Sequence, residues 1–197
     1  MNSLNDEPSV PSEPSDAPPL DLHLRAAVLE IERHAAEAGW DQPARLFALV
    51  PTADLLAQEP GLADMVGVEP DADLTGSLTP VEQDELPPGQ HIEELLTQLT
   101  WPEEVLGAAV VVERLVLPPS VGDLPEDASA AQELAQSHPD RQDVRMVAAA
   151  TRAGSTYCAL RLRSQDEASA VLEGADLVPA LLELLTSTLD TMDEPEQ

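Results

Sequence analysis

The sequence predicts an α+β fold, a single domain with a mostly antiparallel β-sheet and with N-terminal, middle and C-terminal helices packed on it. Three observations support this prediction. Apolar residues recur at helical spacing near both ends of the chain and once in between. Strand-like apolar runs separate these helical segments, and two of them, within residues 143–164, are joined by a short turn sequence. The chain of 197 residues is long enough for one domain with a real core and short for two.

We expect this domain to span residues 21–192. Residues 1–20 hold five prolines, four serines and four acidic residues with little to bury, which predicts a disordered tail. Residues 193–197 form a second, acidic tail. Acidic loops are expected inside the domain near residues 59–90 and 118–140.

The first helix is expected to begin after Asp21, which can cap its start, and to stop at Gly39, which suits a C-terminal cap. Its residues at neighbouring helical positions predict one shared face. That face comprises Leu22, Ala26, Leu29, Arg33 and Ala36, with Val28 and Ile31 beside it.

A strand is predicted over residues 45–52, followed by a short helix that Thr52 caps and that runs to Gln58. A weak strand follows within residues 77–86. Residues 91–99 then predict about two turns of helix with an apolar face.

The most strand-like stretch, "TWPEEVLGAAVVVERLVLPP" at residues 100–119, contains two adjacent charges, Glu113 and Arg114. Adjacent strand residues point to opposite faces, so these two charges need separate partners. The partners considered are Arg145 or Arg163 for Glu113, and Glu103 or Glu104 for Arg114.

A hairpin is predicted over residues 143–164, with a two-residue connection at Ala153 and Gly154. In that register one face carries three opposed pairs. These are Ala150 with Tyr157, Ala148 with Ala159, and Met146 with Arg161; the other face carries Val147, Ala149, Cys158, Leu160 and Leu162. A short helix is expected over residues 127–136, and a last helix over 176–192 with Asp176 as its cap.

The charge balance excludes several functions. There are 38 acidic and nine basic residues, all nine basic residues are arginines, and the net charge is −29. Without lysine, the chain cannot use a Schiff-base lysine or a phosphate-binding loop of the GxxxxGK type. The negative field also repels nucleic acid and anionic membranes, so neither is an expected partner. We expect a soluble, cytoplasmic protein without a cofactor, whose partner is another protein.

"DADLTGSLTPVE", residues 71–82, matches the calcium-loop pattern at Asp71, Asp73, Thr75, Gly76 and Glu82. Prolines and a glycine in the flanks do not suit the entering and exiting helices of such a loop. An acidic, solvated loop is the alternative interpretation, and it is favoured.

The remaining motifs do not predict an enzyme. "DADLT" resembles the nucleophile motif of haloacid-dehalogenase-like phosphatases but has neither the preceding buried strand nor the lysine, and "HPD" at 138–140 stands without the basic helix of a J-domain. The four histidines are scattered, and Cys158, the only cysteine, lies within a predicted strand, where a buried thiol is expected. No catalytic constellation emerges.

Arginines are unevenly distributed. No arginine lies between Leu46 and Glu113, whereas residues 140–163 hold five. Internal pairing with carboxylates is the simpler interpretation. The alternative is a site for an anionic ligand or for the acidic segment of a partner, formed by Arg114, Tyr157, Arg161 and Arg163.

Four strings, "AGWDQPARLFALVPT", "WPEEVLGAAVVVERLVLPP", "DVRMVAAATRAGSTYCALRLRS" and "LEGADLVPALLELL", resemble a family of acidic, uncharacterised cytoplasmic proteins from actinobacteria. The resemblance covers roughly residues 21–190 and implies no established activity, cofactor or catalytic residue. Two functions therefore stand: a non-enzymatic protein–protein interaction or chaperone-like adaptor module, or a protein that binds a small anion through its arginines or calcium through residues 71–82.

Overall fold

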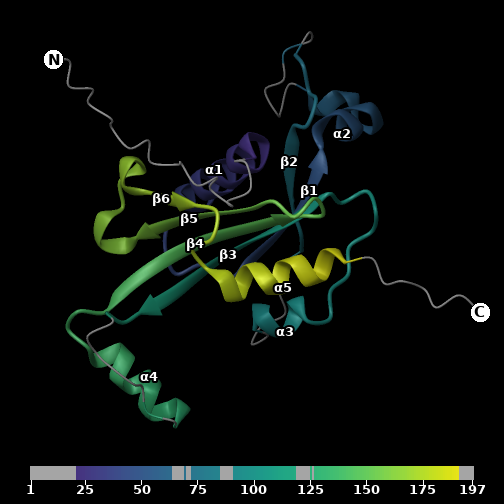
Figure 1. Ribbon diagram of the computed structural model, residues 1–197. Helices are drawn as coiled ribbons and strands as arrows, with labels where there is room; N and C mark the ends of the chain where they lie inside the picture. Colours follow the sequence, from purple (N-terminus) through teal and green to yellow (C-terminus); the bar gives the residue numbers. More distant parts are fainter. Residues whose placement is uncertain are drawn as a thin grey trace, which may run out of the picture.

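The computed structural model describes the chain at residues 21–63, 69, 72–84, 91–118, 125 and 127–190. Its centre is a six-stranded sheet in the order β2-β1-β3-β4-β5-β6, in which every neighbouring pair is antiparallel (Figure 1). The predicted α+β class is confirmed. The strands are β1 (Arg45–Pro51), β2 (Leu78–Glu82), β3 (Gly107–Val116), β4 (Gln142–Thr151), β5 (Thr156–Leu162) and β6 (Leu172–Gly174). The expected tails at 1–20 and 193–197 lie outside the described residues.

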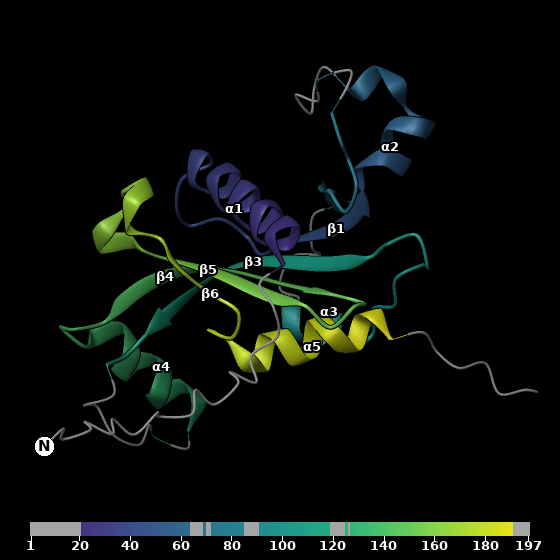
Figure 2. The ribbon, with the colours of Figure 1, turned by 45° about the horizontal axis from the view of Figure 1, so that its top comes forward.

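Helices cover both faces of the sheet. Helix α1 (Leu22–Glu37) crosses one face, and helices α5 (Pro179–Leu189) and α3 (Ile92–Leu96) lie on the other (Figures 1 and 2). Helix α4 (Ala128–Ser137) extends from one end of the sheet, at the predicted short helix. Helix α2 (Thr52–Gln58) projects past the end of β1.

Two apolar clusters, one on each face, form the core. Alternating residues of the central strand β3 enter different clusters: Val110 and Val112 pack with α3 and α5, whereas Val111 packs with α1. The predicted alternation along this strand is therefore confirmed. Both faces are apolar because both are covered, as expected for a central strand.

Helix α1 begins as predicted but packs through a different face. The Asp21 carboxylate accepts hydrogen bonds from the backbone N–H groups of His23 and Leu24, and Gly39 follows the helix with φ at 82°. The expected face was wrong, since Leu22 is 65% exposed. The buried side chains are those of Leu24, Ala27, Val28, Ile31, Glu32 and Ala35.

The segment from β1 to β2 follows the prediction, with one local difference. Thr52 does not cap α2 from outside but is its first residue, and Pro51 takes the capping position. The Thr52 hydroxyl lies 2.9 Å from the hydroxyl of Thr79 on β2. This contact ties the start of α2 to the edge strand.

The β4–β5 hairpin forms in a register that differs by one residue from the prediction. Ala149, not Ala150, lies opposite Tyr157, and Arg145, not Met146, lies opposite Arg161. The connection has three residues, 152–154, and the backbone N–H of Thr151 donates to the carbonyl of Ser155. Since side chains alternate along a strand, the shift moves Tyr157 and Arg161 to the face that α1 covers.

The C-terminal part differs from expectation at two points. Helix α5 begins at Pro179, with Val178 at the capping position, so Asp176 lies three residues before the helix and is not its cap. Strand β6, which the sequence did not predict, pairs with β5 and forms one edge of the sheet. It is three residues long, too short to show a strand periodicity.

Candidate functional site

Arg161, a candidate binding residue, lies inside the protein. Its side chain is 5% exposed and donates two hydrogen bonds to the carboxylate of Glu32 on α1, at 2.5 and 2.7 Å. Glu32 is equally buried. Arg161 is therefore covered by α1 and does not present a cationic surface on the sheet.

Tyr157 lies on the same covered face, 6% exposed. Its hydroxyl accepts a hydrogen bond from Arg25 on α1 and donates one to Glu173 on β6, at 3.2 and 3.1 Å. Burial raises the pKa of this phenol above its ordinary value. The residue joins a helix to the sheet edge.

Arg163 lies just after β5 and is 43% exposed. It donates two hydrogen bonds of 2.8 Å to Asp41, and this pairing lowers the pKa of the Asp41 carboxyl. The indole of Trp40 has the guanidinium groups of Arg145 and Arg163 at 4.3 and 5.6 Å from its centroid. These contacts fix the loop between α1 and β1 on the sheet.

Glu113 pairs with Arg145, one of the two partners expected for it. The Arg145 side chain is 1% exposed and its Nη2 lies 2.9 Å from the Glu113 carboxylate. Arg145 also donates to the Gly39 carbonyl, while its Nη1 has no hydrogen-bond partner among the described residues. The second carboxylate oxygen of Glu113 accepts from the backbone N–H of Asp41, at 2.7 Å.

Arg114 lies on the opposite face of the sheet from Arg161. Its partner is Glu93 on α3, at 2.5 Å, and not Glu103 or Glu104 as expected. The Arg114 side chain is 41% exposed. The structure thus separates the four candidate residues. Tyr157 and Arg161 lie under α1, Arg163 lies beside Trp40, and Arg114 lies on the other face, paired with Glu93 near α3 and α5.

The candidate calcium loop does not close around a common centre in the described residues. Asp71 lies outside them. Asp73 accepts a hydrogen bond from the Thr75 backbone, whereas Glu82, the twelfth residue of the motif, lies in β2 and is held by Arg45 at 2.5 and 2.6 Å. In a calcium loop the twelfth residue lies close to the first, so that both coordinate the same ion. An extended strand instead places the twelfth residue far from the first.

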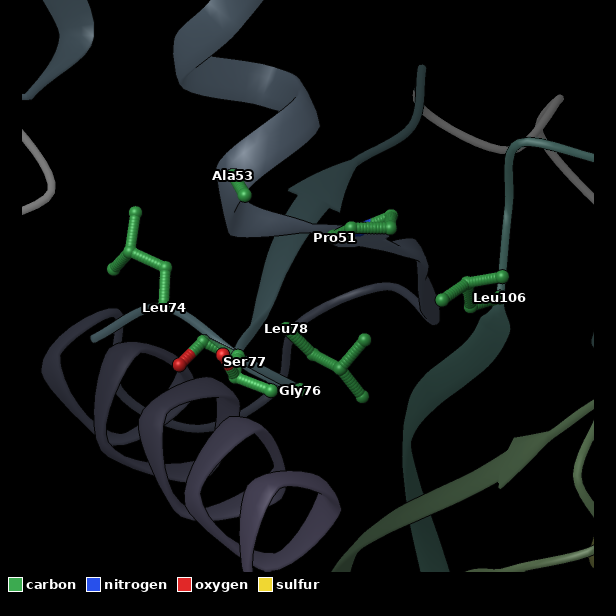
Figure 3. Close-up of a pocket in the computed structure, with 8 residues that line it drawn as sticks. Pro51, Ala53, Leu74, Gly76, Ser77, Leu78 and Leu106 are labelled. Atoms are coloured by element: carbon green, nitrogen blue, oxygen red, sulfur yellow. The ribbon is translucent and has the colours of Figure 1, made fainter.

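A small pocket of about 370 Å³ lies beside this segment (Figure 3). Its side chains come from the junction of β1 and α2, from residues 74–78, and from Leu106 before β3. Gly76, in the wall, has φ at 75°, and a Cβ there would meet the His23 ring at 2.9 Å. The lining is apolar with one serine and one threonine hydroxyl, so it offers little to orient a substrate.

A larger groove of about 870 Å³ opens on the face that carries α3 and α5, over the β1–β2 end of the sheet. Ala48 and Val50 of β1 and Val81 of β2 form its floor. One wall comes from α2, including Leu55, and the other comes from the loop at residues 101–106. We call this feature the β1–β2 groove.

The β1–β2 groove has an acidic rim. Asp54 on α2 and Glu103 and Glu104 on the loop are among its lining residues, and all three are exposed. None of the described residues that line it is basic. All of the described residues that line the groove come from the arginine-free part of the sequence, between Leu46 and Glu113.

A family model described as PPA1309-like protein matches residues 24–190, well over half of the chain. The chain belongs to the PPA1309-like protein family. This agrees with the expected membership of an uncharacterised family. Searches of the curated proteins and of the solved structures gave no match.

In this PPA1309-like chain, the described residues contain no group of three or more His, Cys, Asp or Glu side chains placed to hold a metal ion. Cys158 is fully buried, and burial raises the pKa of its thiol, as the sequence position suggested. Across the described ranges, no helix has both the length and the apolarity needed to cross a membrane.

Sequence reasoning missed the β1–β2 groove of the PPA1309-like fold because its residues come from three distant segments. One feature of the sequence pointed to an acidic surface: residues 46–113 contain many acidic residues and no arginine. Locating that surface also requires knowing that β1 pairs with β2 and where the loop at residues 101–106 lies, and neither can be read from the sequence.

Proposed function

We propose that the chain is a non-enzymatic interaction module, of the adaptor or chaperone-like kind, and that the β1–β2 groove binds a segment of a partner protein. The segment is extended or helical and carries apolar residues flanked by lysine or arginine. The single observation behind the proposal is an apolar groove with an acidic border. The actinobacterial and cytoplasmic setting that the sequence suggested is part of the same proposal.

The apolar character of the groove supports a protein partner. Val81 and Leu106 are 36% and 41% exposed, and both line the groove. Contiguous apolar surface rimmed by polar residues is typical of protein–protein interaction sites. Its volume of about 870 Å³ suits several side chains of one segment.

The charges determine the kind of segment. Asp54, Glu103 and Glu104 border the groove, and the whole chain carries a net charge of −29. A cationic segment is attracted by this field before contact, which raises its association rate, while acidic segments are repelled. The partner is therefore basic at the edges of its apolar contact.

The test uses a synthetic helical peptide of leucine and lysine as the probe, with binding followed by fluorescence anisotropy. We expect Glu103→Gln with Glu104→Gln to weaken binding about tenfold, because two rim charges near the partner's cations are lost. The matched control is Glu30→Gln with Glu37→Gln, which removes the same charge from two exposed positions on α1.

An equal loss of affinity in the rim variant and in the α1 variant would contradict the proposal, because it would show attraction by net charge alone. A peptide with serine in place of leucine provides the second control. It keeps the charge, so we expect it to bind weakly and without distinguishing the two variants.

A further inference from the structure

A separate cavity of about 300 Å³ lies between the start of α5 and the sheet, away from the β1–β2 groove. It is apolar except at one side, where Arg114 and Glu93 stand. The apolar lining comes from β3, β4 and the first turns of α5. These residues are Val112, Met146, Val178, Pro179, Ala180, Leu181 and Leu184.

Arg114 has hydrogen-bonding capacity left. A guanidinium group carries five N–H donors. Within the described residues, Arg114 donates one bond to the Glu113 carbonyl at 3.3 Å and one to Glu93 at 2.5 Å. Of the described residues that line the cavity, Arg114 is the basic one.

The Arg114–Glu93 pair is open to exchange. The two side chains are 41% and 45% exposed, and ion pairs with that degree of exposure contribute little to stability. Another carboxylate that also gains apolar burial can therefore replace Glu93 on the guanidinium group. In the Arg161–Glu32 pair both side chains are only 5% exposed, so a ligand carboxylate cannot reach the guanidinium group to replace Glu32.

We propose that this cavity binds an amphiphilic carboxylate, an aliphatic chain that ends in a carboxyl group. Arg114 holds the carboxylate in the two-bond geometry that a guanidinium favours, and the side chains of α5 and the sheet enclose the aliphatic chain. The cavity volume is at the small end for ligand sites, which suits a short aliphatic chain. This function is distinct from the binding of a basic partner in the β1–β2 groove.

The net negative charge of the molecule does not prevent such binding. At physiological ionic strength, charges are screened over about 8 Å, so a carboxylate at the cavity responds mainly to nearby groups. The nearest of these are Arg114 and Glu93, and the incoming carboxylate takes the place of Glu93 on the guanidinium group. Association should strengthen as salt is added, because salt screens the repulsion from distant carboxylates more than the short contact with Arg114.

The test is calorimetric titration of the full chain with octanoate, octanol and acetate. We expect octanoate to bind, acetate to fail for lack of an aliphatic chain, and octanol to bind more weakly. Arg114→Gln should lower the affinity for octanoate about tenfold or more and leave octanol unchanged, because only the carboxylate contacts the guanidinium.

Two further variants separate the roles of charge and cavity. Glu93→Gln frees the guanidinium from its competitor, so octanoate should bind about two- to fivefold more tightly. Ala180→Leu places a larger side chain at the exposed edge of the cavity and should weaken the binding of octanoate and octanol alike. Thermal melting shows whether each variant remains folded.

Arg163→Gln is the matched control, because Arg163 is 43% exposed and paired with a carboxylate, as Arg114 is, but lies away from the cavity. It should leave octanoate binding unchanged. The proposal is overturned if octanoate does not bind the unmodified chain, if Arg114→Gln has no effect, or if Arg163→Gln has the same effect.

Discussion

Charged side chains on the α1 face form a continuous row across three strands. Strand pairing sets Glu113 beside Arg145, and Arg145 beside Arg161. Two adjacent buried arginines repel each other and each needs a carboxylate. Arg145 receives Glu113 from its own sheet, and Arg161 receives Glu32 from α1. Two of the five arginines at residues 140–163, Arg145 and Arg161, are thus buried inside the fold, whereas Arg141 and Arg163 are exposed.

The Arg161–Glu32 pair leads to a prediction about stability. Arg161→Met alone leaves a carboxylate buried without its partner, and it should lower the free energy of unfolding by about 3–5 kcal/mol. The double variant Arg161→Met with Glu32→Leu should recover most of that loss, because both charges are removed and apolar surface replaces them. Urea denaturation measures both.

The matched control is Arg163→Met, which breaks a pair that is 43% and 74% exposed and should change stability by at most about 1 kcal/mol. Glu32→Leu alone completes the set of variants. If the losses in the free energy of unfolding caused by Arg161→Met and by Glu32→Leu simply add in the double variant, the two side chains do not act as a buried pair and the prediction fails.

At the level of single residues, the sequence predicted some ion-pair partners and missed others. Glu113 and Arg145 were found because both lie on strands whose alternation fixes their direction. The partner of Arg114 was missed because Glu93 belongs to a helix, and the approach of α3 to β3 depends on packing that no local pattern encodes. Arg161 was expected on a face with Met146 and is found under α1.

Among the elements, the β4–β5 turn has the largest effect. A three-residue connection ends at Gly154, whose φ is 83°, and this geometry shifts the register by one residue relative to a two-residue turn. The shift decides which face each side chain of β5 occupies. One turn therefore determines that Tyr157 and Arg161 are buried under α1.

Gly154→Ala tests the role of the turn. A Cβ at this position meets nothing within 4 Å, so the cost is the backbone conformation alone, and we expect a loss of about 1–2 kcal/mol in the free energy of unfolding. Gly61→Ala is the matched control: it also meets nothing within 4 Å, but its φ is not in the left-handed region. It should be neutral or slightly stabilising.

Chemical denaturation measures the two glycine variants side by side. Equal effects would mean that the backbone of Gly154 does not set the conformation of the turn. The contrast is informative because both sites are open and differ in φ.

Helices and strands were largely predictable as elements, whereas the orientation of α1 was not. Its buried face includes Glu32, which a hydropathy pattern counts as solvent-facing, so the pattern favoured a face centred on Ala26 and Leu29. A paired buried charge hides the true periodicity. Strand β6 was missed because three residues are too few to show a period.

Over the whole molecule, 38 acidic residues oppose nine arginines. Most of the arginines described above are already paired within the fold, so the remaining carboxylates repel one another. Such self-repulsion destabilises the compact state and is relieved by salt.

The midpoint of thermal unfolding should therefore rise by a few degrees when NaCl is raised from about 10 mM to 100 mM at pH 7, since the screening length falls from about 30 Å to about 10 Å. The same salt change near pH 4.1, the isoelectric point of the sequence, should have little effect. Differential scanning calorimetry gives both values. A midpoint that falls with salt at pH 7 would show that the ion pairs outweigh the net repulsion.

The sequence alone determined the class of the fold, the order of its main elements and the excess of negative charge, because periodicity and composition are local properties of the chain. It also placed the acidic, arginine-free segment that borders the β1–β2 groove. Tertiary structure decided which charges are buried, which face of α1 packs, and where Arg114 meets an apolar cavity. These depend on strand register and on helix approach, which join residues far apart in the chain through packing rather than through any local pattern.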